Sequence, residues 1–113
     1  MMTDNKRVTN KQILDKIDAL KVGDEGLNTL AVKIVSRMMN IQTMTEWYEH
    51  VSSSDIAIEV MDKKLSLTEE ENAIGDLAKY MTLINLFEDK EEYEKCAICK
   101  LKTDNINKIL EKY

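Results

Sequence analysis

Residues 67–113 read LTEEENAIGDLAKYMTLINLFEDKEEYEKCAICKLKTDNINKILEKY and contain two helical segments in succession. Thr68 and Glu71 have the spacing of a capping box. In this motif the threonine hydroxyl accepts a hydrogen bond from an orphan amide, and the glutamate side chain reaches back to the cap amide. The first helix is therefore expected to begin near Thr68. The acidic connection at residues 88–92 separates it from the second helix.

The helix after Thr68 carries the apolar pattern of a core helix. At 100° per residue, many of its apolar positions fall within about 120° on one side. These positions are Leu67, Ile74, Leu77, Ala78, Met81 and Ile84, widened by Tyr80 and Phe87. Leu83 and Leu86 lie further round, so we expect this helix to pack against more than one neighbour. Gly75 costs about 1 kcal/mol relative to alanine inside a helix, unless a neighbour needs the space.

The apolar face of the final segment changes along its length. Tyr93, Cys96, Ala97 and Leu101 share one side, and roughly opposite them lie Ile98, Ile106, Ile109, Leu110 and Tyr113. Either one continuous helix is covered on both sides, which is the favoured interpretation, or the helix breaks near residues 103–105, where the sequence favours caps and turns. A two-sided terminal helix with too little chain to cover both sides predicts an oligomer or a protein partner.

The candidate interaction residues follow from this pattern. They are Tyr93, Leu101, Ile98, Ile106, Ile109 and Leu110, together with Trp47 and Tyr48. The last two are included because tryptophan and tyrosine often anchor protein interfaces. Burial in the core is the favoured alternative for Trp47 and Tyr48.

Residues 77–97 resemble the UVR motif of nucleotide-excision-repair proteins and some protease adaptors. The motif is an antiparallel helical hairpin with an aromatic-Glu-x-Ala-Ala signature. Tyr93, Glu94 and Ala97 match it, whereas Cys96 stands in place of the first alanine. The Leu-Arg-Asp that follows in the family falls on residues 99–101, which read Cys-Lys-Leu and depart from it. The resemblance implies a helical hairpin that makes protein–protein contacts.

The composition is that of an all-α protein. The chain has 113 residues, no proline, three glycines and 33% charged residues. This length is enough to bury roughly 65% of the unfolded surface in one core. We expect a flexible arm at residues 1–8 and a single domain at residues 9–113. That domain is predicted to be a bundle of about five helices that ends in an antiparallel helical hairpin.

Charge and location follow from the same sequence. No apolar run approaches the roughly 18 residues that span a bilayer, and the start is not a signal peptide. A cytoplasmic protein with free thiols is expected, and the lysine-rich, isoleucine-rich composition fits a bacterium or phage. The net charge of −5 is uneven, with nine acids and two lysines in residues 67–94 but five lysines and two acids in residues 95–113. Such segregation can support antiparallel pairing of the two segments or of two protomers.

Capping signals also divide the first half of the chain. Thr9 to Gln12 form a capping box before a helix that is expected to end at Val22-Gly23, with the glycine left-handed. Asp24 caps a second helix, which has the cleanest apolar stripe and should end near Met39 or Asn40. Thr43 to Glu46 supply a third box. Residues 44–65 are predicted to be helical, with a kink or loop at Ser52–Asp55 and a helix at residues 55–64.

No constellation predicts catalysis, a metal site or a cofactor. Cys96 and Cys99 lie inside a helix after an acidic run, which raises rather than lowers a thiol pKa, so they are interpreted as packing residues. His50 is the only histidine and no second cysteine pair exists, so a zinc site lacks ligands. Serines 52–54 near His50 lack a nucleophile elbow. The acids at 69–71 suit a helix amino terminus. We therefore expect a protein that is not an enzyme.

Two functions from different classes remain. The leading hypothesis is a small acidic cytosolic protein, an adaptor, regulator or inhibitor, that binds another protein or itself as a homo-oligomer. The alternative is a nucleic-acid-associated regulator that uses the helices at residues 10–40. Its second helix offers only Lys33 and Arg37 as exposed cations, and the acidic pI near 4.9 works against phosphate binding.

Overall fold

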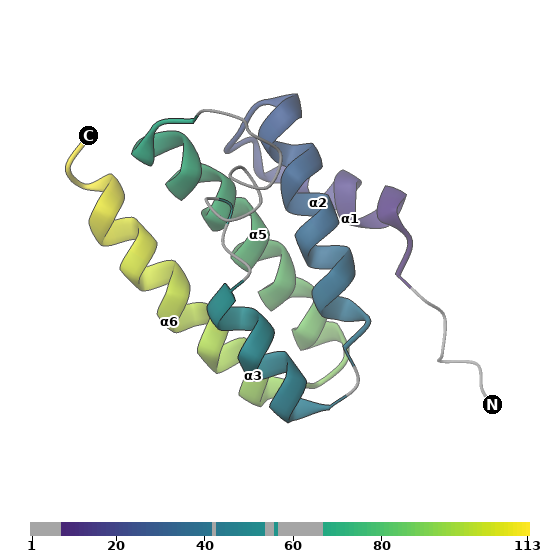
Figure 1. Cartoon of the computed structure of the whole chain (residues 1–113). Helices are drawn as coiled ribbons and strands as arrows, with labels where there is room; N and C mark the ends of the chain where they lie inside the picture. Colours follow the sequence, from purple (N-terminus) through teal and green to yellow (C-terminus); the bar gives the residue numbers. More distant parts are fainter. Residues whose placement is uncertain (1–7, 42, 54–55, 57–66) are drawn as a thin grey trace.

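The computed structural model describes residues 8–41, 43–53, 56 and 67–113, and every regular element within these ranges is a helix (Figure 1). The helices are α1 (Asn10–Leu20), α2 (Glu25–Met39), α3 (Met44–Ser53), α5 (Glu69–Asp89) and α6 (Tyr93–Leu110). The predicted all-α bundle is confirmed. The helix expected at residues 55–64 and most of the arm expected at residues 1–8 lie outside the described residues; Val8, the last residue of that arm, is partly buried against the core.

Helix α5 is the centre of the bundle. It contacts α1, α2 and α6, and α2 in turn contacts both α1 and α3. Figure 1 shows α6, in yellow, running antiparallel to α5 at the edge of the molecule. Glu91 makes the connection short because it adopts a left-handed conformation with φ of 60°, and the Glu92 amide donates to the Phe87 carbonyl at 2.9 Å. The predicted C-terminal helical hairpin is therefore confirmed.

The capping signals place most helix starts correctly. Complete capping boxes form at Thr9 and Thr68, and Asp24 accepts from the Leu27 amide at 2.9 Å. At Thr43 the hydroxyl accepts from the Glu46 amide at 3.2 Å. Each bond satisfies one of the amides that a helix start leaves without an intrahelical partner.

The backbone differs from the sequence-based expectation after α1 and is continuous through α6. The left-handed residue that ends α1 is Lys21, with φ of 54°, whereas Gly23 has no positive φ, so the prediction for Gly23 was wrong. The break near residues 103–105 does not occur, because α6 is continuous from Tyr93 to Leu110. Thr103 is accommodated within the helix because its hydroxyl donates to the Cys99 carbonyl at 2.9 Å.

The core combines the clean stripe of α2 with a wider face of α5 than expected. The stripe of α2 is buried as predicted, and its members are Leu27, Leu30, Ala31, Ile34, Val35 and Met38. On α5, however, Leu83 and Leu86 are fully enclosed, whereas Ile74, Leu77 and Ile84 are only partly buried. The buried face of α5 therefore lies further round the helix than the predicted stripe, towards Leu83 and Leu86.

Gly75 is explained by close packing. A Cβ atom at this position would lie 3.0 Å from Ile56 Cγ1 and 3.4 Å from Leu27 Cδ2. The glycine therefore makes room for side chains of two neighbouring segments, which offsets its cost in a helix interior.

Candidate interaction surface on helix α6

The inner side of α6 faces α5 and carries a mixed set of residues. Lys95, Cys96, Cys99 and Ile106 are buried there. Cys96 was expected to share the side of Tyr93, and this placement was wrong: its thiol is enclosed and approaches the Ile84 carbonyl of α5 at 3.6 Å. The buried residues of the inner side are thus one lysine, two cysteines and one isoleucine.

The outer side of α6 carries the exposed apolar residues. Tyr93 is 63% exposed and Leu101 is 65% exposed, and exposed Ala97 lies between them at the same four-residue spacing. Residues four apart on a helix lie one above the other, so the three form one continuous row. We call Tyr93, Ala97 and Leu101 the outer row.

The other candidate residues divide between core and boundary. Ile106 is buried within the chain, and Ile98, Ile109 and Leu110 are partly buried against the core. Of the six candidates on α6, only Tyr93 and Leu101 are therefore largely free of contacts with the rest of the described chain.

The two aromatic residues of α3, Trp47 and Tyr48, differ in exposure. Trp47 is fully buried and packs edge-on against Phe87 of α5, with ring centroids 5.5 Å apart. Trp47 is therefore a core residue that no partner can reach directly, whereas Tyr48 is 44% exposed. The prediction that both residues are buried in the core is therefore confirmed for Trp47 and wrong for Tyr48.

The Lys95 side chain of α6 contacts aromatic residues of both α5 and α3. Its Nζ bonds to Glu92 Oε1 at 2.9 Å and lies over the rings of Phe87 and Trp47, 5.1 Å and 5.7 Å from their centroids. A partly desolvated ammonium is attracted by aromatic faces, and the lysine stem fills space beside them. Sequence reasoning missed this burial, because a lysine normally indicates an exposed position.

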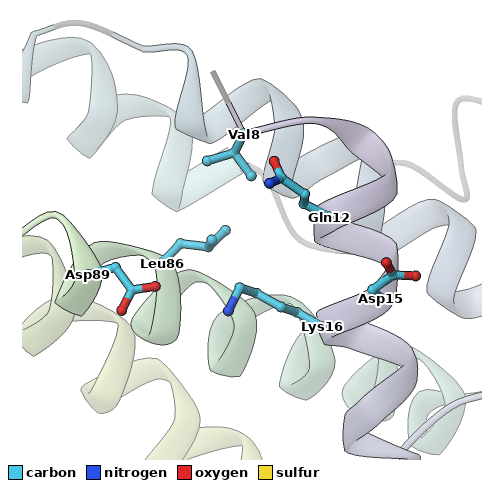
Figure 2. A pocket seen from close by; sticks show the side chains of 6 residues that line it. All are labelled: Val8, Gln12, Asp15, Lys16, Leu86 and Asp89. Carbon is cyan, nitrogen blue, oxygen red and sulfur yellow. The ribbon is translucent and has the colours of Figure 1, made fainter. Parts of the chain in front are cut away.

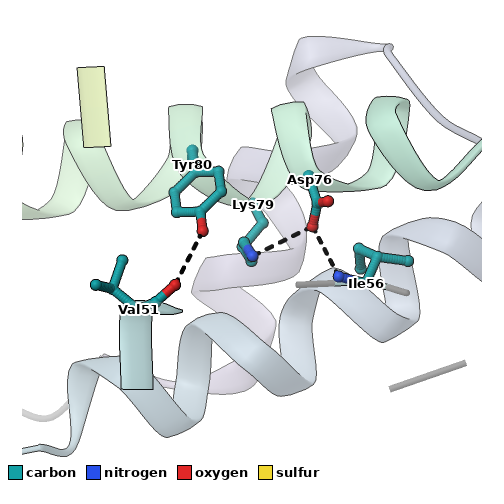
Figure 3. Close-up of polar contacts among 5 residues, drawn as sticks. All are labelled: Val51, Ile56, Asp76, Lys79 and Tyr80. Atoms are coloured by element: carbon teal, nitrogen blue, oxygen red, sulfur yellow. Dashed lines mark hydrogen bonds and ion pairs between the residues drawn. The ribbon is translucent and has the colours of Figure 1, made fainter. Parts of the chain in front are cut away.

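A second buried lysine lies beneath α6, on α5. Lys79 is fully enclosed, with its Nζ 3.2 Å from Asp76 Oδ1. Figure 3 shows that Asp76 also accepts from the Ile56 amide, at 2.8 Å, while the Tyr80 hydroxyl donates to the Val51 carbonyl at 3.4 Å. These bonds tie α5 to the end of α3 and to Ile56. Because Lys79 has no access to solvent, the network is structural.

Both cysteines are packing residues, as the sequence predicted. Each is a buried free thiol. Burial raises the pKa of Cys96, with Glu88 adding to the effect, and burial raises the pKa of Cys99 to about 12. Thiols held protonated are poor nucleophiles and poor metal ligands. Across the described ranges, no three His, Cys, Asp or Glu residues are grouped closely enough to hold a metal ion.

A surface hollow of about 330 Å³ lies between α1 and α5. Figure 2 shows its lining: Val8, Gln12, Asp15, Lys16, Leu86 and Asp89. Lys16 Nζ donates to Asn85 Oδ1 at 2.9 Å, so it joins the two helices at the surface. The carboxylates of Asp15 and Asp89 belong to exposed residues. Charged groups that stay in water orient a small molecule weakly, so this hollow differs from a typical ligand pocket.

No protein-family model matches the chain, and neither curated proteins nor solved structures show significant similarity to it. Among the helices described above, none combines the length and apolarity that crossing a bilayer requires.

Proposed function

We propose that this chain is a small cytoplasmic protein-binding module, acting as an adaptor, regulator or inhibitor, and that it contacts its partner through the outer row of α6. The observation that carries the proposal is the exposure of Tyr93 and Leu101, 63% and 65%, on a helix whose opposite side is already packed against α5. The partner would cover the apolar side chains that the bundle leaves exposed.

The chemistry of the outer row suits a protein interface. Tyrosine is enriched among the residues that contribute most to protein interfaces. A leucine about two turns away adds apolar area that a partner can bury. Ala97 between them lets a partner backbone approach the helix closely. Scattered exposed apolar residues are ordinary on protein surfaces, but three in one row on a terminal helix form an organised strip.

The UVR resemblance supports the same surface. Two of its matching residues, Tyr93 and Ala97, belong to the outer row, and the third, Glu94, is exposed beside them. Of the departures from the motif, Cys96 and Cys99 lie on the buried inner side, whereas Lys100 and Leu101 are exposed. The resemblance therefore supports the part of the outer row at Tyr93 and Ala97, and the role of Leu101 is proposed from its exposure alone.

Site-specific photo-crosslinking tests the proposal. A benzophenone amino acid replaces Leu101 in one variant and Lys11, an exposed residue of α1, in a matched control, and both are expressed in the cells that make the protein. We expect the Leu101 position to give a discrete adduct at high yield and the Lys11 position to give at most about a tenth of that yield.

Leu101→Glu provides the second arm. When a probe replaces Tyr93 in the same chain, this substitution should abolish the adduct, because a carboxylate placed in an apolar contact must be desolvated. Equal adduct yields from positions 101 and 11, or none from either, would contradict the proposed surface.

A further inference from the structure

The charges around the outer row alternate in sign along α6. In chain order they are Glu94, Lys100, Asp104 and Lys108, and all four residues are exposed. At 100° per residue these four and the outer row fall within about 120° of helix surface. The apolar row and the charges therefore make up a single face.

This arrangement is self-complementary when the helix is reversed. Glu94 lies seven residues before Leu101 and Lys108 lies seven residues after it, while Lys100 and Asp104 each lie two residues from position 102. A second α6 laid antiparallel, with its Leu101 opposite the first, therefore brings Glu94 opposite Lys108 and places Asp104 within two residues, about 3 Å along the helix axis, of Lys100. A parallel copy in register would place like charges opposite one another, which is unfavourable.

Most of these charges are available for such pairing. Within the described part of the chain, Glu94, Asp104 and Lys108 make no hydrogen bond or ion pair. Lys100 approaches Glu88 of its own chain at 3.9 Å, and both side chains of that pair are more than half exposed, so the contact is loose.

Resting on the proposed function, we infer that the partner is a second copy of this chain, bound as a symmetric dimer through antiparallel α6 helices with Leu101 of each copy near the two-fold axis. The same patch serves both copies, as a two-fold interface requires. Tyr93 then lies beside the stem of the partner's Lys108. The charges fix register, and the outer row supplies the apolar contact.

The size of the face sets the strength of the dimer. Eighteen residues at 1.5 Å each make a helix about 27 Å long, and one face of it buries less than the roughly 800 Å² per partner of a standard interface. We therefore expect reversible association with a dissociation constant of about 10–100 µM. Dimers should dominate only at high local concentration.

Sedimentation equilibrium from about 1 to 500 µM at low salt measures this constant. Glu94→Lys and Lys108→Glu should each raise it about tenfold, because each change creates two like-charge contacts in the symmetric dimer. The double variant Glu94→Lys/Lys108→Glu should return to within about threefold of the original value. Lys11→Glu on α1 is the matched control and should change it less than twofold. Circular dichroism confirms that each variant is folded.

The outcomes separate this inference from the proposed function. A chain that stays monomeric at 500 µM, or a double variant that is no better than the single ones, overturns the antiparallel dimer. If position 101 still gives an adduct to a different protein, the proposed function stands without self-association. A dimer indifferent to Leu101→Glu overturns the α6 interface as well.

Discussion

Each side of α6 carries residues that are unusual for its environment. The inner side encloses the charged Lys95 and two thiols, whereas the outer side exposes a tyrosine and a leucine. On the inner side, neighbouring groups stabilise the buried charge, because the Lys95 ammonium lies beside a carboxylate and two aromatic rings. The outer side has no such support within the described chain. The comparison teaches that the inner side stabilises the fold and the outer side is available for binding.

The largest expected effect is at the buried ion pair beneath α6. Asp76→Ala should lower the free energy of unfolding by about 3–5 kcal/mol, because it removes the carboxylate beside the enclosed Lys79 ammonium and the acceptor of the Ile56 amide. Urea denaturation at low micromolar concentration measures this change.

The matched variant for that pair is Lys79→Met, which removes the buried charge while keeping the length of the stem. It should cost far less than Asp76→Ala, since a buried charge is more costly without its partner than when both charges are absent. Equal losses for the two variants would show that the ammonium is not truly enclosed.

Substitutions on the inner and outer sides of α6 test directly which side stabilises the fold. Ile106→Ala on the inner side should cost about 2–4 kcal/mol, because it opens a cavity in the core. Leu101→Ala on the outer side should stay within about 0.5 kcal/mol in dilute solution, where no partner covers it. Both values come from urea denaturation of the monomer, and similar losses at both positions would contradict the assignment of the two sides.

A pH dependence is also expected at Cys99. Its pKa rises from an ordinary 9.0 to about 12 in the folded chain, so above pH 9 the unfolded chain loses this proton before the folded chain does. The free energy of unfolding should therefore fall by about 1.4 kcal/mol per pH unit between pH 9.5 and 11 on account of this group. The difference between the original chain and Cys99→Ala isolates the effect from the titration of lysines, and parallel pH profiles would refute it.

Local signals were the most reliable part of the sequence. Capping boxes at Thr9 and Thr68 and the cap at Asp24 mark true helix starts, because these motifs depend only on residues three apart. The left-handed turn after α1 was misplaced, since Lys21 takes a conformation that glycine adopts at lower cost.

The inner side of α6 was the least predictable part of the candidate site. Apolar periodicity treats lysine as an exposed residue, so it missed the burial of Lys79 on α5 and of Lys95 on α6. Both buried lysines have an acid three residues earlier, Asp76 and Glu92, but that spacing is also common on exposed helix surfaces. The sequence placed Tyr93, Ala97 and Leu101 on one side of the final helix, but it grouped Cys96 with them. It also predicted four further interaction residues on this helix that the structure buries or partly buries, namely Ile98, Ile106, Ile109 and Leu110. Apolar periodicity alone does not show which side of a two-sided helix the rest of the chain covers.

Hydroxyl-radical footprinting of the outer row tests the central claim most directly. The oxidation rates of Tyr93 and Leu101 are compared between the dilute purified chain and the chain isolated in its native assembly, with exposed Tyr48 as the internal reference. We expect both rates to fall at least fivefold in the assembly while the Tyr48 rate stays within about twofold. Unchanged rates at Tyr93 and Leu101 would contradict the claim that another protein covers this face of α6.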